Sequence, residues 1–140
     1  MELEKEVEFL KKYLSIEQIR FGSRLEIIID YSTSLNKIMI PSLILQPVVE
    51  NAIQHGIAKH RGKGYVEIKI LKENDKLKLL VHNNGRLKSP KSQESGIGLR
   101  MTQDRLKSIY GSNYKLELTE TPQDGTQALI EIPIIEESAQ

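Results

Sequence analysis

The chain has 140 residues, of which 39% are hydrophobic and 28% charged, so it has enough apolar material for one domain with an ordinary core. Its formal net charge of +1 creates no overall field that would attract nucleic acid or an anionic membrane, so we expect no nucleic-acid partner, and any phosphate site has to be local. The absence of cysteine excludes disulfides, thiolate chemistry and cysteine-based zinc sites, and no apolar run approaches the length of a membrane span.

The first predicted element is a helix from Glu2 to about Arg20, because its apolar residues recur at helical spacing. They form two stripes, one with Leu3, Val7, Leu10 and Leu14 and another with Phe9, Tyr13 and Ile16. Two stripes allow either a second packing partner, such as another helix docked on the Leu3 stripe, or an ordinary terminal helix. Phe21-Gly22-Ser23 end this helix, and the isoleucine-rich run from Leu25 to Asp30 predicts a short strand.

A second helical region is expected from about Pro41 to Gly56, with Pro41 in the first turn and Gly56 as the C-terminal cap. Pro47 falls inside this region. Because proline cannot donate the backbone hydrogen bond of a helix interior, either the helix kinks there or a turn ends and a second helix begins.

The runs Gly64 to Leu71 and Lys76 to Val81 are typical of strands, and Glu73-Asn74-Asp75 between them is typical of a turn, so the pair predicts a hairpin. The following stretch from Gly85 to Gly96 has almost no apolar residues. We expect a surface loop there, and a loop of this length in a compact domain is more often functional than idle.

Helical spacing resumes at Leu99 and stops at Tyr110-Gly111, and the alternating runs Tyr114 to Thr119 and Gln127 to Ile132 predict two more strands. The order of elements is helix, strand, helix, two strands, loop, helix and two strands. This order predicts an α+β fold, a two-layer α/β sandwich with helices on one face of a mixed, mainly antiparallel sheet.

Polar side chains interrupt the otherwise apolar second helix at Glu50, Asn51, Gln54 and His55. Asn51 and His55 share one helix face, as do Glu50 and Gln54. A carboxylate beside a carboxamide suits a magnesium-phosphate site, because the amide oxygen is a hard ligand and the carboxylate can accept a proton. The alternative for this cluster is a solvated helix face.

Two further motifs could bind phosphate or end a strand. Gly96-Ile97-Gly98-Leu99 lies between the polar loop and a helix, where glycines allow close backbone approach and free amides bind anions. Val81-His82-Asn83-Asn84-Gly85 would by itself be an ordinary exit from a strand. Neither motif is specific alone.

In combination, these motifs resemble a known family. Pro-Ser-Leu-Ile-Leu-Gln-Pro-Val-Val-Glu-Asn-Ala-Ile-Gln-His-Gly (41 to 56) resembles the N box of sensor histidine kinases of the LytS/YehU type. Gly-Ile-Gly-Leu-Arg-Met-Thr-Gln-Asp-Arg-Leu (96 to 106) is similar to their second glycine box, and Asn83-Asn84-Gly85 stands where the first would be. Residues 1–22 resemble the segment that joins the phosphoacceptor helices to the ATP-binding catalytic domain, which would be residues 23–140.

The resemblance implies the Bergerat (GHKL) fold, with ATP between the N-box helix and a lid. Asn51 would bind Mg²⁺ that bridges the phosphates, and Glu50 would be the catalytic acid/base group. His55 and Lys59 would flank the nucleotide.

The remaining contacts with ATP follow from the other motifs of the family. Asn83 would accept a hydrogen bond from the adenine amino group, and Thr126 would support the adenine through its hydroxyl or a water. Gly85, in the first glycine box, would also bind ATP. The backbone amides of Gly96, Ile97, Gly98 and Leu99 would hold the phosphate tail.

The chain departs from the family pattern at three positions. The family usually has Asp in place of Asn83, and an Asn oxygen accepts the adenine hydrogen bond without charge assistance. Leu87 replaces an expected glycine, and Met101 stands where Asn is common. These departures predict weakened nucleotide affinity.

The resemblance also implies partners that the chain does not contain. The family's phosphoacceptor motif is absent, since His55 belongs to the N-box motif, His60 lies in a basic loop and His82 on a predicted strand. We therefore expect a cytoplasmic fragment that binds ATP without phosphorylating itself. Its parent would be a homodimeric kinase in the bacterial inner membrane that passes phosphate to a response regulator. The alternative is a regulatory module of the same fold, with weak or no nucleotide binding, that acts through protein partners.

Overall fold

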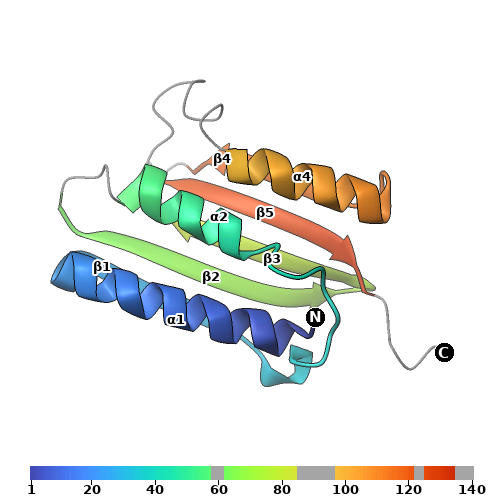
Figure 1. The fold of residues 1–140 in the computed structure, drawn as a ribbon, viewed down its shortest axis with the longest axis horizontal. Helices are drawn as coiled ribbons and strands as arrows, with labels where there is room; N and C mark the ends of the chain where they lie inside the picture. Colours follow the sequence, from blue (N-terminus) through green and yellow to red (C-terminus); the bar gives the residue numbers. More distant parts are fainter. Residues whose placement is uncertain (58–61, 85–96, 122–124, 135–140) are drawn as a thin grey trace.

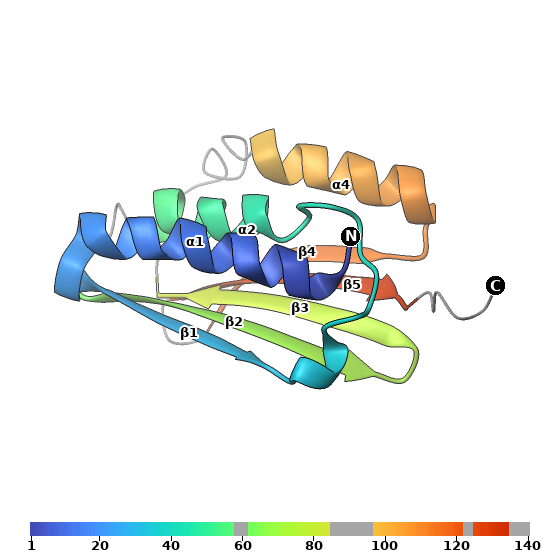
Figure 2. The same cartoon turned by 60° about the horizontal axis from the view of Figure 1, so that its bottom comes forward.

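The computed structural model describes residues 1–57, 62–84, 97–121 and 125–134. A five-stranded sheet forms one layer, and helices α1, α2 and α4 cover one of its faces (Figures 1 and 2). The strands are β1 (Leu25–Tyr31), β2 (Gly64–Glu73), β3 (Lys76–Asn83), β4 (Lys115–Glu120) and β5 (Thr126–Pro133). The helices are α1 (Leu3–Phe21), α2 (Gln46–Asn51) and α4 (Ile97–Tyr110), with short 3-10 turns η1 (Gly22–Arg24) and η2 (Thr33–Leu35) and a π-helical segment η3 (Ala52–Ile57).

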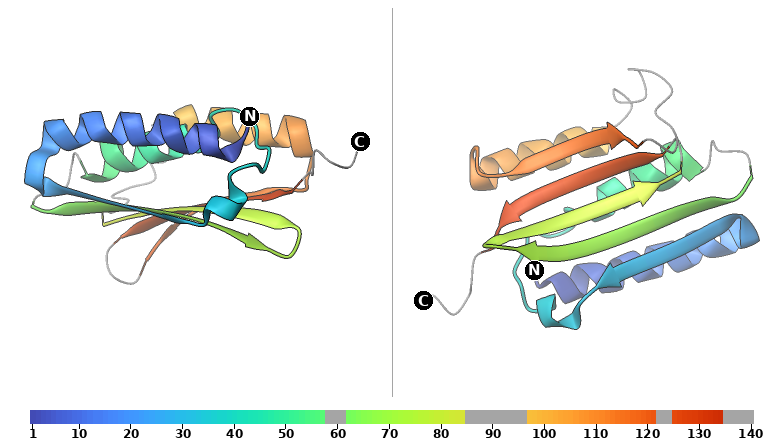
Figure 3. Two further views of the ribbon diagram at one scale, coloured as in Figure 1. Left: turned by 90° about the horizontal axis from the view of Figure 1, so that it is seen from below. Right: turned by 180° about the vertical axis from the view of Figure 1, so that it is seen from behind.

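The sheet has the order β1-β2-β3-β5-β4, in which β1 is parallel to β2 and every other neighbouring pair is antiparallel. Figure 3 shows that the described helices all lie on one side, which leaves the other face of the sheet uncovered by them. The predicted two-layer α+β sandwich with a mixed sheet is therefore confirmed, and so is the hairpin of β2 and β3.

Strands β2, β3 and β5 bury alternate residues over most of their length, because successive side chains point to opposite faces of a sheet. In β3 the buried set is Leu77, Leu79, Val81 and Asn83, and β5 alternates in the same way from Thr126 onward. The apolar members of this set belong to the core between sheet and helices. Asn83 and Thr126 are thus polar residues at the end of two apolar rows that face the helix layer.

The predicted helix over residues 41–56 is wrong in its first part. Residues 41–45 form turns, and α2 begins only at Gln46, with Pro47 in its first turn. Of the two alternatives at Pro47, the turn followed by a new helix is correct, because a proline in the first turn lacks only an N–H that has no helical acceptor there. Gly56 is not a cap, since it lies inside η3.

Helix α1 directs its two stripes to different surroundings. Leu3, Val7, Leu10 and Leu14 are buried in the core of this domain, so the expectation that the Leu3 stripe docks another helix is wrong. On the second stripe, Phe9 is 44% exposed and Ile16 is 64% exposed.

The division of the chain into residues 1–22 and residues 23–140 stays a prediction. No helix in the described ranges is long and apolar enough to cross a membrane.

Candidate functional site

The carboxylate and carboxamide of the predicted N box lie at the C-terminal end of α2. Glu50 and Asn51 are half-buried, and Gln46 Nε2 donates to Glu50 Oε1 at 3.3 Å. The chain continues directly into η3, whose Ala52 and Ile53 are buried in the core. π-Helical turns are rare in proteins, and those that occur lie frequently at functional sites.

The side-chain oxygen atoms of this region fit a magnesium ion that is bound by both protein and phosphate oxygens. The amide oxygen of Asn51 and the carboxylate of Glu50 are hard oxygen ligands, and Mg²⁺ usually takes only one or two ligands of this type from a protein beside the phosphates. Within the described part of the chain, no cluster of three or more His, Asp or Glu side chains offers a dedicated metal cage. The oxygen ligands of Glu50 and Asn51 fit an ion whose remaining ligands come from phosphates.

Asn83 and Thr126 form the sheet side of the site. They are direct neighbours across the antiparallel pair β3–β5 and are only 4% and 6% exposed. Segment η3 contacts β3 and β2, so the helix that carries Asn51 packs over this part of the sheet. The structure thus brings together the two residues that the resemblance assigned to adenine.

Asn84 fixes the end of β3 next to this pair. Its Oδ1 accepts from the backbone N–H of Tyr65 at 3.0 Å, and its Nδ2 donates to the carbonyl of Lys63 at 3.0 Å. The side chain thereby continues the β2–β3 ladder by one residue beyond the last backbone pair, Val66 with Asn83. Asn84 therefore has a structural role that holds Asn83 in place.

Gly125 permits the close approach of the β4–β5 connection to Asn83. A Cβ atom at Gly125 would lie 2.6 Å from the carbonyl oxygen of Asn83 and 2.8 Å from Thr121 Oγ1. The backbone of Gly125 also exchanges hydrogen bonds with Thr121, donating to Oγ1 at 3.1 Å and accepting from its N–H at 2.9 Å. Only glycine fits there, and it places Thr126 beside Asn83.

Helix α4 begins at Ile97, so the amides of Ile97, Gly98 and Leu99 lie in its first turn, where helix geometry provides no intrahelical acceptor. Leu99 is half-buried against the core, and α4 contacts α2.

Gly85, Gly96 and Lys59 lie outside the described residues, as do His60 and the predicted loop. For His55, the structure describes only a backbone position in η3, while His82 lies on β3 as predicted.

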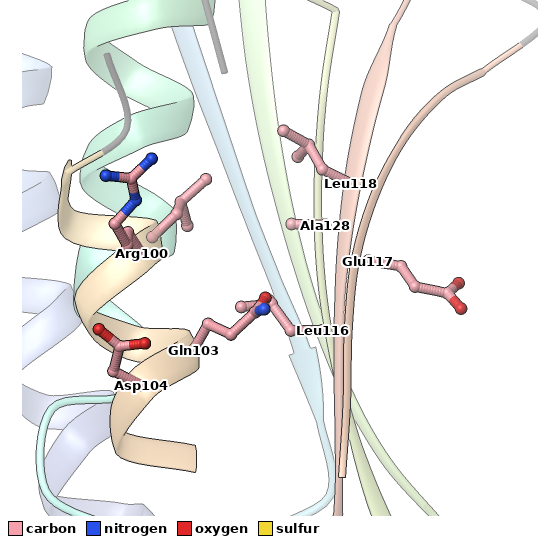
Figure 4. Close-up of a pocket in the computed structure, with 8 residues that line it drawn as sticks. Arg100, Gln103, Asp104, Leu116, Glu117, Leu118 and Ala128 are labelled. Atoms are coloured by element: carbon pink, nitrogen blue, oxygen red, sulfur yellow. The ribbon is translucent and has the colours of Figure 1, made fainter. Parts of the chain in front are cut away.

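A cavity of about 370 Å³ lies between α4 and the strands β4 and β5. Figure 4 shows Arg100, Gln103 and Asp104 on its helix side, while Glu117 points away from it on the far side of the sheet. Its apolar lining is Leu99, Leu116, Leu118 and Ala128. Leu99 belongs to the second glycine motif and Ala128 is two residues from Thr126, so the cavity borders the candidate site, and its volume suits a small molecule.

Sequence reasoning missed one buried acid, Glu6 of α1. Its carboxylate is fully buried and accepts hydrogen bonds from the backbone amides of Ile44, Leu45 and Gln46, where α2 begins. Burial raises the pKa of the Glu6 carboxyl, against a smaller lowering by these hydrogen bonds. The available signal was an acidic residue inside the apolar stripe that contains Leu3 and Val7.

Comparisons with known proteins identify relatives of this chain. Sensor histidine kinase BtsS of Escherichia coli K12 is 34% identical over 128 residues, which are 91% of this chain and 23% of BtsS. Sensor protein LytS of Oceanobacillus iheyensis is 32% identical over 133 residues, which are 85% of this chain and 23% of LytS. The chain therefore spans less than a quarter of the length of these relatives. No protein-family model matches it.

The fold is similar to that of solved histidine kinase domains. The solved catalytic domain of histidine kinase ThkA, in a nucleotide-free form, superposes with a TM-score of 0.69 at 17% identity, covering 95% of this chain and 94% of that domain. Identity at this level supports the fold, while the sequence relatives support the family. The chain therefore belongs to the sensor histidine kinases related to LytS and BtsS, and it has the fold of a histidine kinase catalytic domain.

Proposed function

We propose that this domain binds Mg-ATP and transfers the γ-phosphoryl group to a histidine on an upstream helix of its parent protein. The observation that carries the proposal is the buried pair Asn83–Thr126 on the helix-facing side of the sheet, under the helical segment that continues from Glu50 and Asn51. Two side chains that can form hydrogen bonds with a ligand, at the end of two apolar rows, suit a flat apolar base with polar edges, such as adenine.

Each residue has a role that its position supports. The Asn83 oxygen accepts a hydrogen bond from the adenine amino group, and the Thr126 hydroxyl supports the base. The first-turn amides of α4, from Ile97 to Leu99, bind the phosphate tail. Asn51 holds Mg²⁺, which neutralises phosphate charge when it is bound. His55, Lys59, Gly85 and Gly96 remain proposed contacts by their places in the motifs.

In the transfer step, a nitrogen of the substrate imidazole attacks the γ-phosphorus in line with the leaving oxygen. The nitrogen–phosphorus bond forms as the bond to the β–γ bridging oxygen breaks, and ADP leaves with that electron pair. Glu50 accepts the proton that the imidazole loses. Because the nucleophile has to lie close to the phosphorus and in line, only docking of the helix that carries it completes the site.

The partners follow from this requirement. The parent is a homodimeric kinase anchored in the bacterial inner membrane, with this domain in the cytoplasm, and its phosphohistidine supplies a response regulator. The exposed side chains Phe9 and Ile16 on α1 are available for contact with the upstream helices, while the Leu3 stripe is already buried.

The test is a calorimetric titration of the chain with Mg-ATP or a non-hydrolysable analogue. We expect a dissociation constant in the micromolar to millimolar range, because the adenine contact has no charge assistance. A second assay incubates the chain with labelled ATP, alone and with the parent's upstream helices, and we expect label only on a histidine of those helices. Absence of nucleotide binding at millimolar concentration would contradict the proposal and favour a regulatory module that acts through protein partners.

A further inference from the structure

The N-terminus of α2 is held by a side chain from α1. Glu6, which is 0% exposed, accepts from the amide of Ile44 at 3.3 Å, from that of Gln46 at 3.1 Å, and from that of Leu45 between them. The amides of Leu45, the N-cap residue, and Gln46, the first helical residue, have no intrahelical acceptors, and the next residue, Pro47, has no N–H. A single carboxylate thus provides the acceptors for the start of α2.

A buried carboxylate is a costly way to obtain stability alone. Desolvation of the charge opposes the three charge-assisted hydrogen bonds, and replacement of buried ionic groups by apolar ones often leaves stability unchanged or higher. Its distinctive property is geometric, since both oxygens are used and a shift of α1 relative to α2 breaks several bonds together. This arrangement fixes the position of one helix against the other.

The turn that presents these amides is itself strained. Leu43 has a φ of +55°, a left-handed backbone conformation that residues other than glycine rarely adopt. Its carbonyl also lies 3.5 Å from Arg105 Nη1 of α4. Such a backbone persists only when its surroundings determine it, and it recurs at sites that position ligands or switch between states.

Helix α1 also lies close to the other end of α2. Tyr13 is one heptad after Glu6 and therefore on the same helix face. Its pKa is raised to about 12 by burial first and then by the negative charges of Glu17 and Glu50. Helix α1 contacts α2, which has six residues and is about 9 Å long, so a displacement of α1 at Glu6 would be felt within one short helix of Glu50 and Asn51.

We propose that Glu6 is a positioning residue, which couples the placement of α1 to the placement of Asn51 at the nucleotide. This inference rests on the proposed magnesium role of Asn51. When α1 moves, as it would if the upstream helices drew on it, the start of α2 either follows Glu6 or loses its hydrogen bonds. In both cases Asn51 shifts relative to Asn83 and Thr126, which the sheet holds still.

The first experiment measures ADP affinity by calorimetry, with Mg²⁺ and with a chelator in its place, for the wild-type chain, Glu6→Gln and Glu8→Gln. Glu8 is exposed on the same helix and is the matched control. In Glu6→Gln we expect affinity with Mg²⁺ to fall about tenfold or more, since residues that orient a metal ligand commonly have effects of this size. Affinity without Mg²⁺ should change less than about twofold, because adenine binds on the sheet side.

Loss of stability alone gives a different pattern. If Glu6→Gln lowers the melting temperature but the folded variant keeps its wild-type affinity with Mg²⁺, or loses both affinities by the same factor, the inference is wrong. Should Glu6→Gln fail to fold, Glu6→Asp decides with the same two titrations. It keeps the charge on a side chain one methylene shorter, so a weaker effect confined to binding with Mg²⁺ is expected, and wild-type values would contradict the coupling.

The second experiment measures hydrogen exchange, first without nucleotide and then with Mg-ADP. Amide hydrogen exchange of residues 44–51 should accelerate about tenfold in Glu6→Gln, while exchange in β2 and β3 stays unchanged and Glu8→Gln behaves as wild type. Because coupling is reciprocal, Mg-ADP should slow exchange in α1 of the wild type but not of Glu6→Gln. If the wild-type chain binds no nucleotide, the proposed function fails, and this experiment decides separately whether Glu6 links the helices. Unchanged exchange at residues 44–51 would overturn the inference.

Discussion

The two sides of the proposed nucleotide site are built in different ways. Asn83 and Thr126 lie in adjacent strands inside the sheet, where β2 and β4 pair with β3 and β5 from outside, so backbone ladders fix them. Glu50 and Asn51 lie on a six-residue helix whose start depends on a carboxylate from another helix. The sheet side resembles a fixed platform for the base, whereas the helix side can be adjusted by its neighbours.

The largest effect is expected on the helix side, from Asn51→Ala. Loss of a metal ligand should lower affinity for Mg-ADP by about 10- to 100-fold, without unfolding the domain, because Asn51 is half-buried and outside the apolar core. Calorimetry with and without Mg²⁺ measures this effect. Gln54→Ala, an exposed position three residues further along, is the control and should keep wild-type affinity. Equal magnesium dependence in Asn51→Ala would place the metal elsewhere.

On the sheet side, Gly125→Ala should perturb the platform itself. The new methyl group would lie within 3 Å of the Asn83 carbonyl and Thr121 Oγ1, and such overpacking typically costs about 1–3 kcal/mol of unfolding free energy. ADP affinity should fall with and without Mg²⁺, unlike the magnesium-specific loss in Asn51→Ala.

Gly111→Ala provides a control for Gly125→Ala. It introduces strain at a φ of +67° in open space, at the end of α4 away from the site. Chemical denaturation should show a loss of about 1–2 kcal/mol with ADP affinity unchanged. If the two glycine variants lower ADP affinity equally, the close approach at Gly125 does not shape the site.

A smaller effect, of opposite sign, is expected from Asn83→Asp. A carboxylate accepts a charge-assisted hydrogen bond from the adenine amino group, which should strengthen ADP binding by about 1 kcal/mol. Because the side chain is 4% exposed, the new charge should also lower the stability of the nucleotide-free domain. Thermal melts with and without ADP separate the two effects, and equal or weaker affinity would contradict the predicted adenine contact.

The smallest expected effect concerns pH and the carboxylate that holds α2. Burial raises the pKa of Glu6 above its ordinary 4.5, so the folded protein takes up this proton at a higher pH than the unfolded chain. The stability gained from the proton is complete below the unfolded pKa and is lost as pH rises through the folded value. Relative to Glu6→Gln, the wild type should therefore gain unfolding free energy as pH falls from neutrality toward 4.5. Chemical denaturation across this range measures it, and parallel curves would contradict the raised pKa.

Local patterns in the sequence were sufficient for the type and order of most elements. Alternation predicted β2 to β5, and helical spacing predicted α1 and α4, because each element buries one periodic face in the same core. The site residues Glu50, Asn51, Asn83 and Thr126 were also predicted from the sequence. The prediction was possible because the order and spacing of the motifs that contain them resemble one family. Their roles stay predictions until nucleotide binding is measured.

Only the tertiary structure decided how those residues are supported. The start of α2 at Gln46 rather than near Pro41 depends on acceptors that come from Glu6, about 40 residues earlier in the chain, and local spacing carries no information about such a partner. The burial of the Leu3 stripe and exposure of Phe9 and Ile16 likewise depend on which face of α1 meets the sheet. In the sequence Gly125 lies between two predicted strands, and only the proximity of the Asn83 carbonyl explains why no side chain fits there.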